Sequence, residues 1–296
     1  MNHATIFNEH RGLLFGVAYR MLGSVQEAED VVQDAFVRWQ ETELSTVANP
    51  RAYLTTIVTR LSIDVLRSAR MKRELYVGEW LPEPFVPDAS HPADGLDLAD
   101  TLSTAFLLIL ERLNPTERAA FLLREVFDHP YEHIAEMLDK SEANCRQIVK
   151  RAKDHIQTSR RRFDAAPDQH ERLVLGFITA VNSGDSKAIE ALLTEDAQFH
   201  ADHGGKAAAN KRAIVGADKI GRFLIGVQRF APPNPVVRVA TMNGRLGVIV
   251  YDGECPYTAF SFETDGDRVS MIYSMRNPDK LAHLPSPDEL PSSTVG

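Results

Sequence analysis

The segment at 80–95, WLPEPFVPDASHPADG, limits the fold of this chain more than any other stretch. Its prolines stand at positions 82, 84, 87 and 92. Because proline lacks a backbone N–H and fixes φ, the segment cannot be the interior of a helix, and it predicts an extended linker. Residues 74–100 contain no Lys or Arg, and their acids are Glu74, Glu79, Glu83, Asp88, Asp94, Asp97 and Asp100. We therefore expect an acidic linker between separately folded parts.

The residues before this linker carry apolar side chains at helical spacing, which predicts a helical bundle over 5–73. Ser24 and Glu27 form a capping-box pattern, which predicts the start of the second helix. Asn49 and Pro50 predict the start of the third, because proline is tolerated in the first turn.

After the linker, a helix is expected near 97–112, and NPTE at 114–117 predicts the start of the next. Residues 127–153, FDHPYEHIAEMLDKSEANCRQIVKRAK, then predict two short helices separated by DKS, which is the pattern of a helix-turn-helix. Ser141 is the expected cap of the second helix. The side chains expected to face inward are Ile134, Ala135, Leu138, Cys145, Ile148 and Val149.

Beyond Pro167 the pattern changes. Helices are expected at about 170–183, 185–193 and 216–230, and AQFHADHGGKAA shows partial strand alternation with a Gly-Gly turn. Two hairpins are expected, with turns at Asn243–Gly244 and Asp265–Gly266. Helices followed by a run of antiparallel strands predict a separate α+β domain.

The formal net charge of −8 argues against a nucleic-acid partner, but the charge is unevenly distributed. Residues 51–73 carry six basic side chains against Asp64, namely Arg51, Arg60, Arg67, Arg70, Lys72 and Arg73. Residues 140–162 have only Glu142 and Asp154 against the basic side chains Lys140, Arg146, Lys150, Arg151, Lys153, Arg160, Arg161 and Arg162. Two basic surfaces separated by an acidic linker are therefore expected.

The second helix of the helix-turn-helix is the strongest candidate for DNA contact. Its non-apolar residues are Ser141, Asn144, Arg146, Gln147, Lys150 and Arg151. Asn and Gln suit adenine edges, Arg suits guanine, and Lys and Arg also bind phosphates. The alternative is a solvated basic helix, but the capped turn and the preceding helix favour DNA binding.

Several of these motifs resemble a known family. LNPTERAAFLLREVFDHPYEHIAEML with NCRQIVKRAKDHI resembles region 4 of bacterial RNA polymerase sigma factors, and EAEDVVQDAFVRW with NPRAYLTTIVTRLSIDVLRSARMKRE resembles region 2. Two such regions without an intervening domain resemble the extracytoplasmic-function (ECF) class. WLPEP, DHGGK at 202–206 and NPDKL at 277–281 resemble the subgroup with a C-terminal SnoaL-like domain. The family's glycine-rich motif is usually Asp-Gly-Gly-Gly-Lys, whereas this chain has His203 in the second place.

This resemblance implies a multidomain fold, with two all-α helical domains and a C-terminal α+β SnoaL-like cone. The implied parts are region 2 at 1–75, an acidic linker at 76–100, the helix-turn-helix domain of region 4 at 101–164, a SnoaL-like regulatory domain at 168–285 and a tail at 286–296.

The resemblance also implies an alternative sigma factor that binds core RNA polymerase, through the β′ clamp and the β flap, and directs transcription from promoter DNA. In the family, the helix containing EAEDVVQDAFVRW docks on the coiled coil of the β′ clamp. Its acids suit basic partners there, and they would chiefly set orientation and association rate. The expected polymerase contacts are Asp30, Gln33, Asp34 and Trp39.

In the family, the loop at 41–53 captures unpaired bases of the minus-ten element, which requires a pocket, a stacking surface and cations. The residues that could supply these are Ser45, Asn49, Arg51 and Tyr53, although Tyr53 fits a core position equally well. The following helix is expected to lay a basic side along the phosphates, with Arg60, Asp64, Arg67 and Arg70.

The linker threads toward the RNA path of the polymerase in the family, where its carboxylates could imitate nucleic acid; the alternative is a solubilising tether. Apolar Trp80 and Leu81 suggest that part of it packs against another surface.

The C-terminal domain is implied to be a built-in regulator that contacts region 2 and the linker, with Lys206 paired to an acid there. The implied regulatory residues are Trp80, Leu81, Pro82, Glu83, Pro84, Asp202, Gly204, Gly205, Lys206, Asn277, Pro278, Asp279, Lys280 and Leu281.

Two other functions remain open at this point: a stand-alone, ligand-sensing helix-turn-helix regulator, and a SnoaL-like isomerase or hydrolase. His200, Asp202 and His203 are close in sequence, but on a strand 203 faces away from the other two, so catalysis is not expected.

Two distant cysteines, Cys145 and Cys255, predict no disulfide framework or zinc site, and no metal or cofactor is expected. Without a signal peptide or long apolar run, the chain is expected to be cytoplasmic and without a membrane partner, and the cone could hold an unknown small molecule.

Overall fold

The computed structural model describes residues 2–74, 76–87, 101–157, 167–208, 210 and 212–290, the side chains of 69–74 and 157 excepted. By contacts between residues the chain divides into two compact units. One comprises Met1–Leu75 and Pro87–Arg160, and the other comprises Tyr76–Val86 and Arg161–Gly296. The expected linker at 76–100 is thus divided, because its first part belongs to the unit that contains the C-terminal domain.

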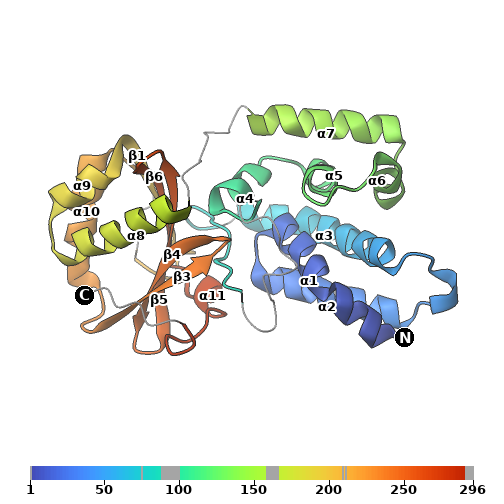
Figure 1. Cartoon of the computed structure of the whole chain (residues 1–296), viewed down its shortest axis with the longest axis horizontal. Helices are drawn as coiled ribbons and strands as arrows, with labels where there is room; N and C mark the ends of the chain where they lie inside the picture. Colours follow the sequence, from blue (N-terminus) through green and yellow to red (C-terminus); the bar gives the residue numbers. More distant parts are fainter. Residues whose placement is uncertain are drawn as a thin grey trace. The chain divides into compact units, whose positions relative to one another are not determined.

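The first unit is helical (Figure 1). Its elements are α1 (His3–Leu22), α2 (Val25–Gln40), the 3₁₀ helix η1 (Leu44–Thr46), α3 (Pro50–Glu74), α4 (Thr104–Leu110), α5 (Pro115–Glu125), α6 (Tyr131–Leu138) and α7 (Glu142–Gln157). α1 packs against α2 and α3, and α5 packs against α1, α3, α6 and α7. The helices on either side of the linker therefore share one packed unit.

The predicted starts of α2 and α5 are confirmed. Ser24 Oγ accepts a hydrogen bond from Glu27 N across 3.1 Å at the start of α2. At α5, Asn114 Oδ1 accepts from Glu117 N across 2.9 Å, and the Glu117 carboxylate accepts from Asn114 N across 3.2 Å, which completes a capping box. α4 begins later than the helix expected at 97–112, because Ser103 caps it by accepting from Phe106 N across 3.2 Å. Residues 97–100 of that expected helix lie outside the described residues.

A buried arginine joins the helices on either side of the linker. The Arg118 side chain of α5 is 4% exposed, and its Nη1 donates to Met21 O across 2.5 Å and to Glu111 Oε1 across 2.7 Å. The Arg20 side chain of α1 is also buried, and that burial lowers its pKa to about 10. A buried cation needs such partners to offset its loss of hydration. The contact between α5 and α1 therefore depends on the partners of Arg118.

The second unit is an α+β structure, as expected. Its helices are α8 (Pro167–Asn182), α9 (Ser186–Leu192), α10 (Ala217–Val227), the 3₁₀ helix η4 (Gln228–Phe230) and α11 (Pro278–Leu281). Its strands are β1 (Leu193–Asp202), β2 (Ile214–Val215), β3 (Pro235–Met242), β4 (Arg245–Asp252), β5 (Cys255–Asp265) and β6 (Arg268–Met275). They form one sheet in the order β2-β1-β6-β5-β4-β3.

Both predicted hairpins are present, β3–β4 and β5–β6. Asn243 and Gly244 have positive φ of 52° and 75°, the backbone that an Asn-Gly turn supplies. The run of strands from β3 to β6 is antiparallel as expected, whereas β1 pairs with β6 in parallel. A parallel pair needs a long connection, and here α10 and four further strands lie between β1 and β6 in the chain.

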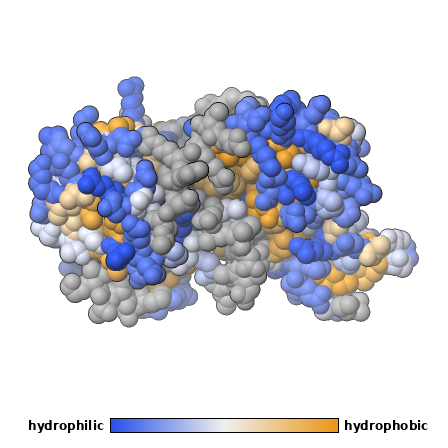
Figure 2. All heavy atoms as spheres, turned by 45° about the horizontal axis from the view of Figure 1, so that its top comes forward, coloured by the Kyte–Doolittle hydropathy of each residue, from blue (hydrophilic) through white to orange (hydrophobic). Residues whose placement is uncertain are grey.

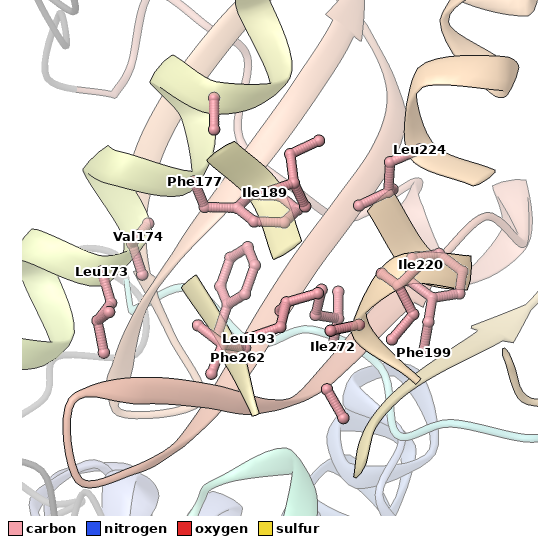
Figure 3. Close-up of a cluster of buried hydrophobic side chains, with 14 of the residues drawn as sticks. Leu173, Val174, Phe177, Ile189, Leu193, Phe199, Ile220, Leu224, Phe262 and Ile272 are labelled. Atoms are coloured by element: carbon pink, nitrogen blue, oxygen red, sulfur yellow. The ribbon is translucent and has the colours of Figure 1, made fainter. Parts of the chain in front are cut away.

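The core of this unit lies between its helices and one face of the sheet. Figure 3 shows side chains of α8, α9 and α10 pointing toward those of β1, β5 and β6. The rings of Phe177 and Phe262 meet edge to face, with centroids 5.0 Å apart. The residues labelled there are Leu173, Val174, Phe177, Ile189, Leu193, Phe199, Ile220, Leu224, Phe262 and Ile272.

Residues 76–86 lie on the other face of the sheet. Phe199 and Ala201 of β1 point into the core just described, so His200 and Asp202 face the opposite way. Leu81 and Phe85 are each 2% exposed, which confirms that part of the linker packs against a surface. In the view of Figure 2, hydrophilic residues cover most of the coloured surface, and hydrophobic residues gather in smaller areas between them.

Candidate functional sites

Helices α6 and α7 form the predicted helix-turn-helix (Figure 1). The chain turns between them at Asp139, whose φ is 53°, and Ser141 Oγ accepts from Asn144 N across 3.3 Å to begin α7. The buried side chains of their shared core are Ala120, Leu123, Ile134, Met137, Cys145, Ile148 and Val149. The predicted inward residues lie in or against this core, and Met137 of α6 belongs to it as well, although it was not predicted.

The predicted DNA-contacting residues of α7 are all exposed. They are Ser141, Asn144, Arg146, Gln147, Lys150 and Arg151. Arg146 Nη2 pairs with Glu142 Oε2 of the preceding turn across 2.8 Å, and both side chains are about half exposed. This helix face combines amide and guanidinium groups, which pair with base edges, with cations that bind phosphates.

The loop before α3 uses some of its predicted residues for its own structure. Asn49 Oδ1 accepts from Ala52 N across 3.1 Å and so caps α3. Ser45 Oγ donates to Glu43 across 2.8 Å. Tyr53 is 39% exposed, and its ring centroid lies 5.9 Å from that of Trp39, so it is partly packed and partly available for stacking. Arg51 is exposed.

The basic residues of α3 have different environments. Arg60 donates to two backbone carbonyls at the end of α6, Met137 O across 2.9 Å and Glu136 O across 3.0 Å, although it was expected to follow phosphates. Arg67 and Asp64 form an exposed ion pair across 3.4 Å. The predicted DNA contact Arg70 has its side chain outside the described residues.

The acidic face of α2 is open to solvent at three of its four predicted polymerase contacts, Asp30, Gln33 and Asp34. The fourth predicted contact, Trp39, is buried and the prediction for it is wrong: it is 0% exposed, and its Nε1 donates to His3 O across 2.9 Å. A side chain in the core of the bundle cannot contact a partner directly. Its helical spacing with Val32 and Ala35 indicated that core position.

On the linker face of the sheet, Asp202 at the end of β1 accepts several hydrogen bonds. Its Oδ1 accepts from Tyr76 Oη across 2.5 Å and from Gly204 N across 3.1 Å. Its Oδ2 accepts from Leu81 N across 2.9 Å and from Lys280 Nζ across 2.7 Å. Asp202 is 0% exposed, so these donors replace the water that a carboxylate needs.

Lys280 of α11 completes this arrangement. Its ammonium donates to Leu81 O across 2.6 Å as well as to Asp202, and it lies 5.0 Å from the ring centroid of Tyr76 and 4.4 Å from that of Trp80. Aromatic faces attract cations, most strongly when water is excluded. We call the group Tyr76, Trp80, Leu81, Asp202, Asn277 and Lys280 the linker site.

Residues beyond the predicted motifs also hold the linker. Asn243 exchanges two hydrogen bonds with Phe85: Asn243 N donates to Phe85 O across 2.8 Å, and Phe85 N donates to Asn243 Oδ1 across 3.1 Å. His283 Nε2 lies 2.7 Å from Pro84 O. Sequence reasoning missed these residues and Tyr76, because such contacts join positions far apart in the chain.

The glycine-rich turn differs in detail from the expectation. Lys206 pairs with Asp279 of the same unit, whereas an acid of region 2 or the linker was the expected partner. Gly204 and Gly205 have φ of 55° and 74°, which glycine adopts without strain. His203 is 5% exposed, and its Nε2 would lie 2.5 Å from a Cβ added at Gly78. The histidine thus fits because Gly78 has no side chain.

Proton equilibria at the linker site favour the neutral tyrosine. Burial first, and then the hydrogen bond to Asp202, raise the pKa of Tyr76 well above its ordinary value. Tyr76 Oη also accepts from Asn277 Nδ2 across 2.8 Å. The phenol therefore stays a donor to Asp202 over the whole physiological range.

The three residues that could have formed a catalytic site, His200, Asp202 and His203, all have structural partners. His200 Nδ1 lies 2.6 Å from Glu79 Oε1, and His203 Nδ1 accepts from Gly205 N across 3.0 Å. Both carboxylate oxygens of Asp202 accept hydrogen bonds at the linker site.

Within the described ranges, no group of three or more His, Cys, Asp or Glu side chains is arranged to hold a metal ion. Of the helices that the structure describes, none is long and apolar enough to cross a membrane.

Comparison with known protein families identifies both helical segments of the first unit. The family model of sigma-70 region 2 matches residues 6–71, which contain most of α1 and α3 and all of α2. That of sigma-70 region 4 matches residues 103–156, which contain α4, α5, α6 and nearly all of α7.

Whole-chain comparisons extend this likeness to the C-terminal unit. The ECF RNA polymerase sigma factor SigJ of Mycobacterium tuberculosis H37Rv is 38% identical over 94% of this chain and 93% of its own length. The chain belongs to the ECF RNA polymerase sigma factors. The crystal structure of M. tuberculosis SigJ superposes with a TM-score of 0.75 at 34% identity, over 94% of this chain and 98% of that one. A probable ECF sigma factor of the same species, SigI, is 28% identical over 93% of both chains.

Membership in this family has two consequences. This ECF sigma factor carries regions 2 and 4, so the alternative of a stand-alone regulator with a single helix-turn-helix is not favoured. The whole-chain relatives are sigma factors, and the family does not point to catalysis.

Proposed function

We propose that this ECF sigma factor binds core RNA polymerase, directs initiation at promoters with two recognised elements, and is regulated by its own C-terminal unit. The observation that supports this most is the exposed face of α7, where amide and guanidinium side chains stand outside a capped helix-turn-helix. The protein acts in the cytoplasm with the polymerase and has no catalytic activity of its own.

In this proposal α7 reads the minus-thirty-five element. Asn144, Arg146 and Gln147 near its start contact base edges, while Lys150 and Arg151 in the next turn bind phosphates. A recognition helix places its N-terminal residues deepest in the major groove, which supports this division.

Region 2 recognises the minus-ten element. Arg51 and the exposed part of Tyr53 supply a cation and a stacking surface beside the loop at 41–53. Arg67 and Asp64 lie further along α3. Arg60 reaches DNA only after it leaves the carbonyl groups at the end of α6.

Polymerase contact is assigned to the acidic face of α2, where Asp30, Gln33 and Asp34 would meet the β′ clamp, and to region 4, which would meet the β flap. Exposed acids chiefly set orientation and association rate, and their effect decreases with salt.

The C-terminal unit acts as a regulator that keeps the linker on its sheet. The buried pair Asp202–Lys280, the rings of Tyr76 and Trp80, and the apolar side chains of Leu81 and Phe85 all favour the docked linker. A two-state linker, docked or released, gives the unit a way to change how the rest of the protein engages polymerase. A small molecule bound by this unit stays a prediction.

A binding experiment with two readouts tests the proposal. Purified protein is mixed with core polymerase and applied to promoter fragments that carry single base-pair changes. We expect a stable complex with the polymerase, and we expect Gln147→Ala to cost about 1–3 kcal/mol and to relax one promoter position. Lys150→Ala should weaken binding to all sequences and flatten its salt dependence. A protein that binds DNA but not core polymerase would support the stand-alone regulator instead.

A further inference from the structure

Tyr131, the first residue of α6, faces guanidinium groups from both neighbouring helices. The guanidinium carbon of Arg146 from α7 lies 4.9 Å from the centroid of the Tyr131 ring, and that of Arg124 from α5 lies 5.1 Å away. Arg146 is one of the exposed residues of the recognition helix. The ring thus contacts a predicted base-reading side chain without standing on that helix.

Tyr131 is itself held in place. It packs against the apolar core of the helix-turn-helix. Arg124, its other cationic neighbour, donates through Nη1 to His129 O across 3.1 Å, in the turn that leads into α6. The ring is therefore a fixed surface, and a side chain stacked on it has less freedom than one in solvent.

Contact with a ring leaves the donors of an arginine available. The N–H groups of a guanidinium lie in its plane, whereas the attraction to an aromatic ring acts through its cationic charge and flat faces. Glu142 Oε2 pairs with Nη2 of Arg146 across 2.8 Å. A guanidinium has five N–H groups in all, so others of them can donate to the O6 and N7 acceptors of a guanine.

We propose that Tyr131 is a positioning residue, which holds the Arg146 guanidinium in the orientation that reads one base pair of the upstream promoter element. This inference rests on the proposed function, because it requires that Arg146 reads a base. Tyr131 contributes to specificity through Arg146 and does not itself contact DNA.

The proposal separates specificity from affinity. Without the ring, Arg146 keeps its charge and still reaches phosphates, so binding to all sequences changes little. Bidentate pairing with one base needs a defined orientation, so discrimination at that position decreases. An exposed cation–π contact changes an equilibrium constant by about two- to fivefold. We expect discrimination at that promoter position to decrease by about the same factor.

Binding of the complex with core polymerase is measured on promoters with every single base-pair change in the upstream element. Arg146→Ala should abolish the preference at one position. Tyr131→Leu should reduce the preference at the same position by about two- to fivefold, while Tyr131→Phe, which keeps the ring, should match the wild type. In an Arg146→Ala background, Tyr131→Leu should have no further effect on preference.

The outcomes are distinguishable. If Arg146→Ala leaves every preference unchanged, both base reading by Arg146 and its positioning by Tyr131 are wrong. If Arg146→Ala removes a preference but Tyr131→Leu lowers binding equally on all sequences, or changes nothing, only the positioning role is wrong. Thermal melting of each variant is measured first, and Tyr131→Met, which preserves apolar volume, replaces Tyr131→Leu if that variant does not fold.

Discussion

Lys280 Nζ and Asp202 Oδ2 lie 2.7 Å apart in the C-terminal unit, and the two side chains are 9% and 0% exposed. The pair joins α11 to the end of β1, and both partners also bind the backbone of Leu81 in the linker. A buried ion pair contributes little net stability over an apolar replacement, but loss of one partner leaves an uncompensated charge. The docked linker therefore depends on both residues together.

Lys280→Met should destabilise the C-terminal unit by about 3–5 kcal/mol, because the Asp202 carboxylate stays buried without its counter-charge. The chain contains two tryptophans, so Trp80 fluorescence in a Trp39→Phe background reports unfolding of this unit. Hydrogen exchange at Leu81 N, which donates to Asp202, should become faster.

Lys206→Met is the matched control, because it removes a lysine from an ion pair whose side chains are 55% and 62% exposed. Exposed pairs are worth about 0–1 kcal/mol, so its effect should be small. The double variant Asp202→Asn with Lys280→Met should be more stable than Lys280→Met alone, because no buried charge remains. Equal costs for the two single lysine variants would show that the buried pair has no special role.

Gly78→Ala should release the linker through a clash with one residue. The added Cβ would lie 2.5 Å from His203 Nε2, and the φ of Gly78 is 92°. In a His203→Ala background the clash is gone, and only a backbone cost of about 1–3 kcal/mol remains. A double-mutant cycle on unfolding free energy should therefore show positive coupling; strictly additive costs would contradict the contact.

Much of the helical part could be predicted because its signals are local. The capping box at Asn114 and the inward positions of α6 and α7 follow from short-range spacing. Trp39 was assigned wrongly to the polymerase face, because the resemblance outweighed a spacing that indicates the core. The parallel pairing of β1 with β6, the partner of Lys206 and the role of Asn243 depend on contacts between distant residues, and no local pattern encodes them.

The correction at Trp39 leads to a prediction. Trp39→Ala should destabilise the first unit by about 3–5 kcal/mol, because a large fully buried side chain is removed. Asp34→Asn, on the exposed face of the same helix, should leave stability within about 0.5 kcal/mol and slow association with core polymerase at low salt. Stopped-flow association at two ionic strengths measures this. An unchanged association rate for Asp34→Asn would remove that residue from the polymerase surface.

Burial lowers the pKa of His170, whose Nε2 lies 2.8 Å from Leu246 O. The unfolded chain therefore binds this proton more readily than the folded one, so the stability of the C-terminal unit should fall as pH decreases through about 6.5. One such group contributes at most about 1.4 kcal/mol per pH unit. His170→Gln should give a shallower dependence in urea unfolding between neutral and mildly acidic pH. Parallel curves for the two proteins would rule out this histidine as a source.

Start-site selection is the most direct test of the central claim. Purified protein and core RNA polymerase are incubated with genomic promoter fragments, and transcript 5′ ends are mapped for the wild type and for Lys280→Met, which should release the linker. We predict defined start sites that core enzyme alone does not use, with a changed yield in the variant. Random initiation with both proteins, at the level of core enzyme alone, would contradict the assignment of this chain as a promoter-specificity subunit.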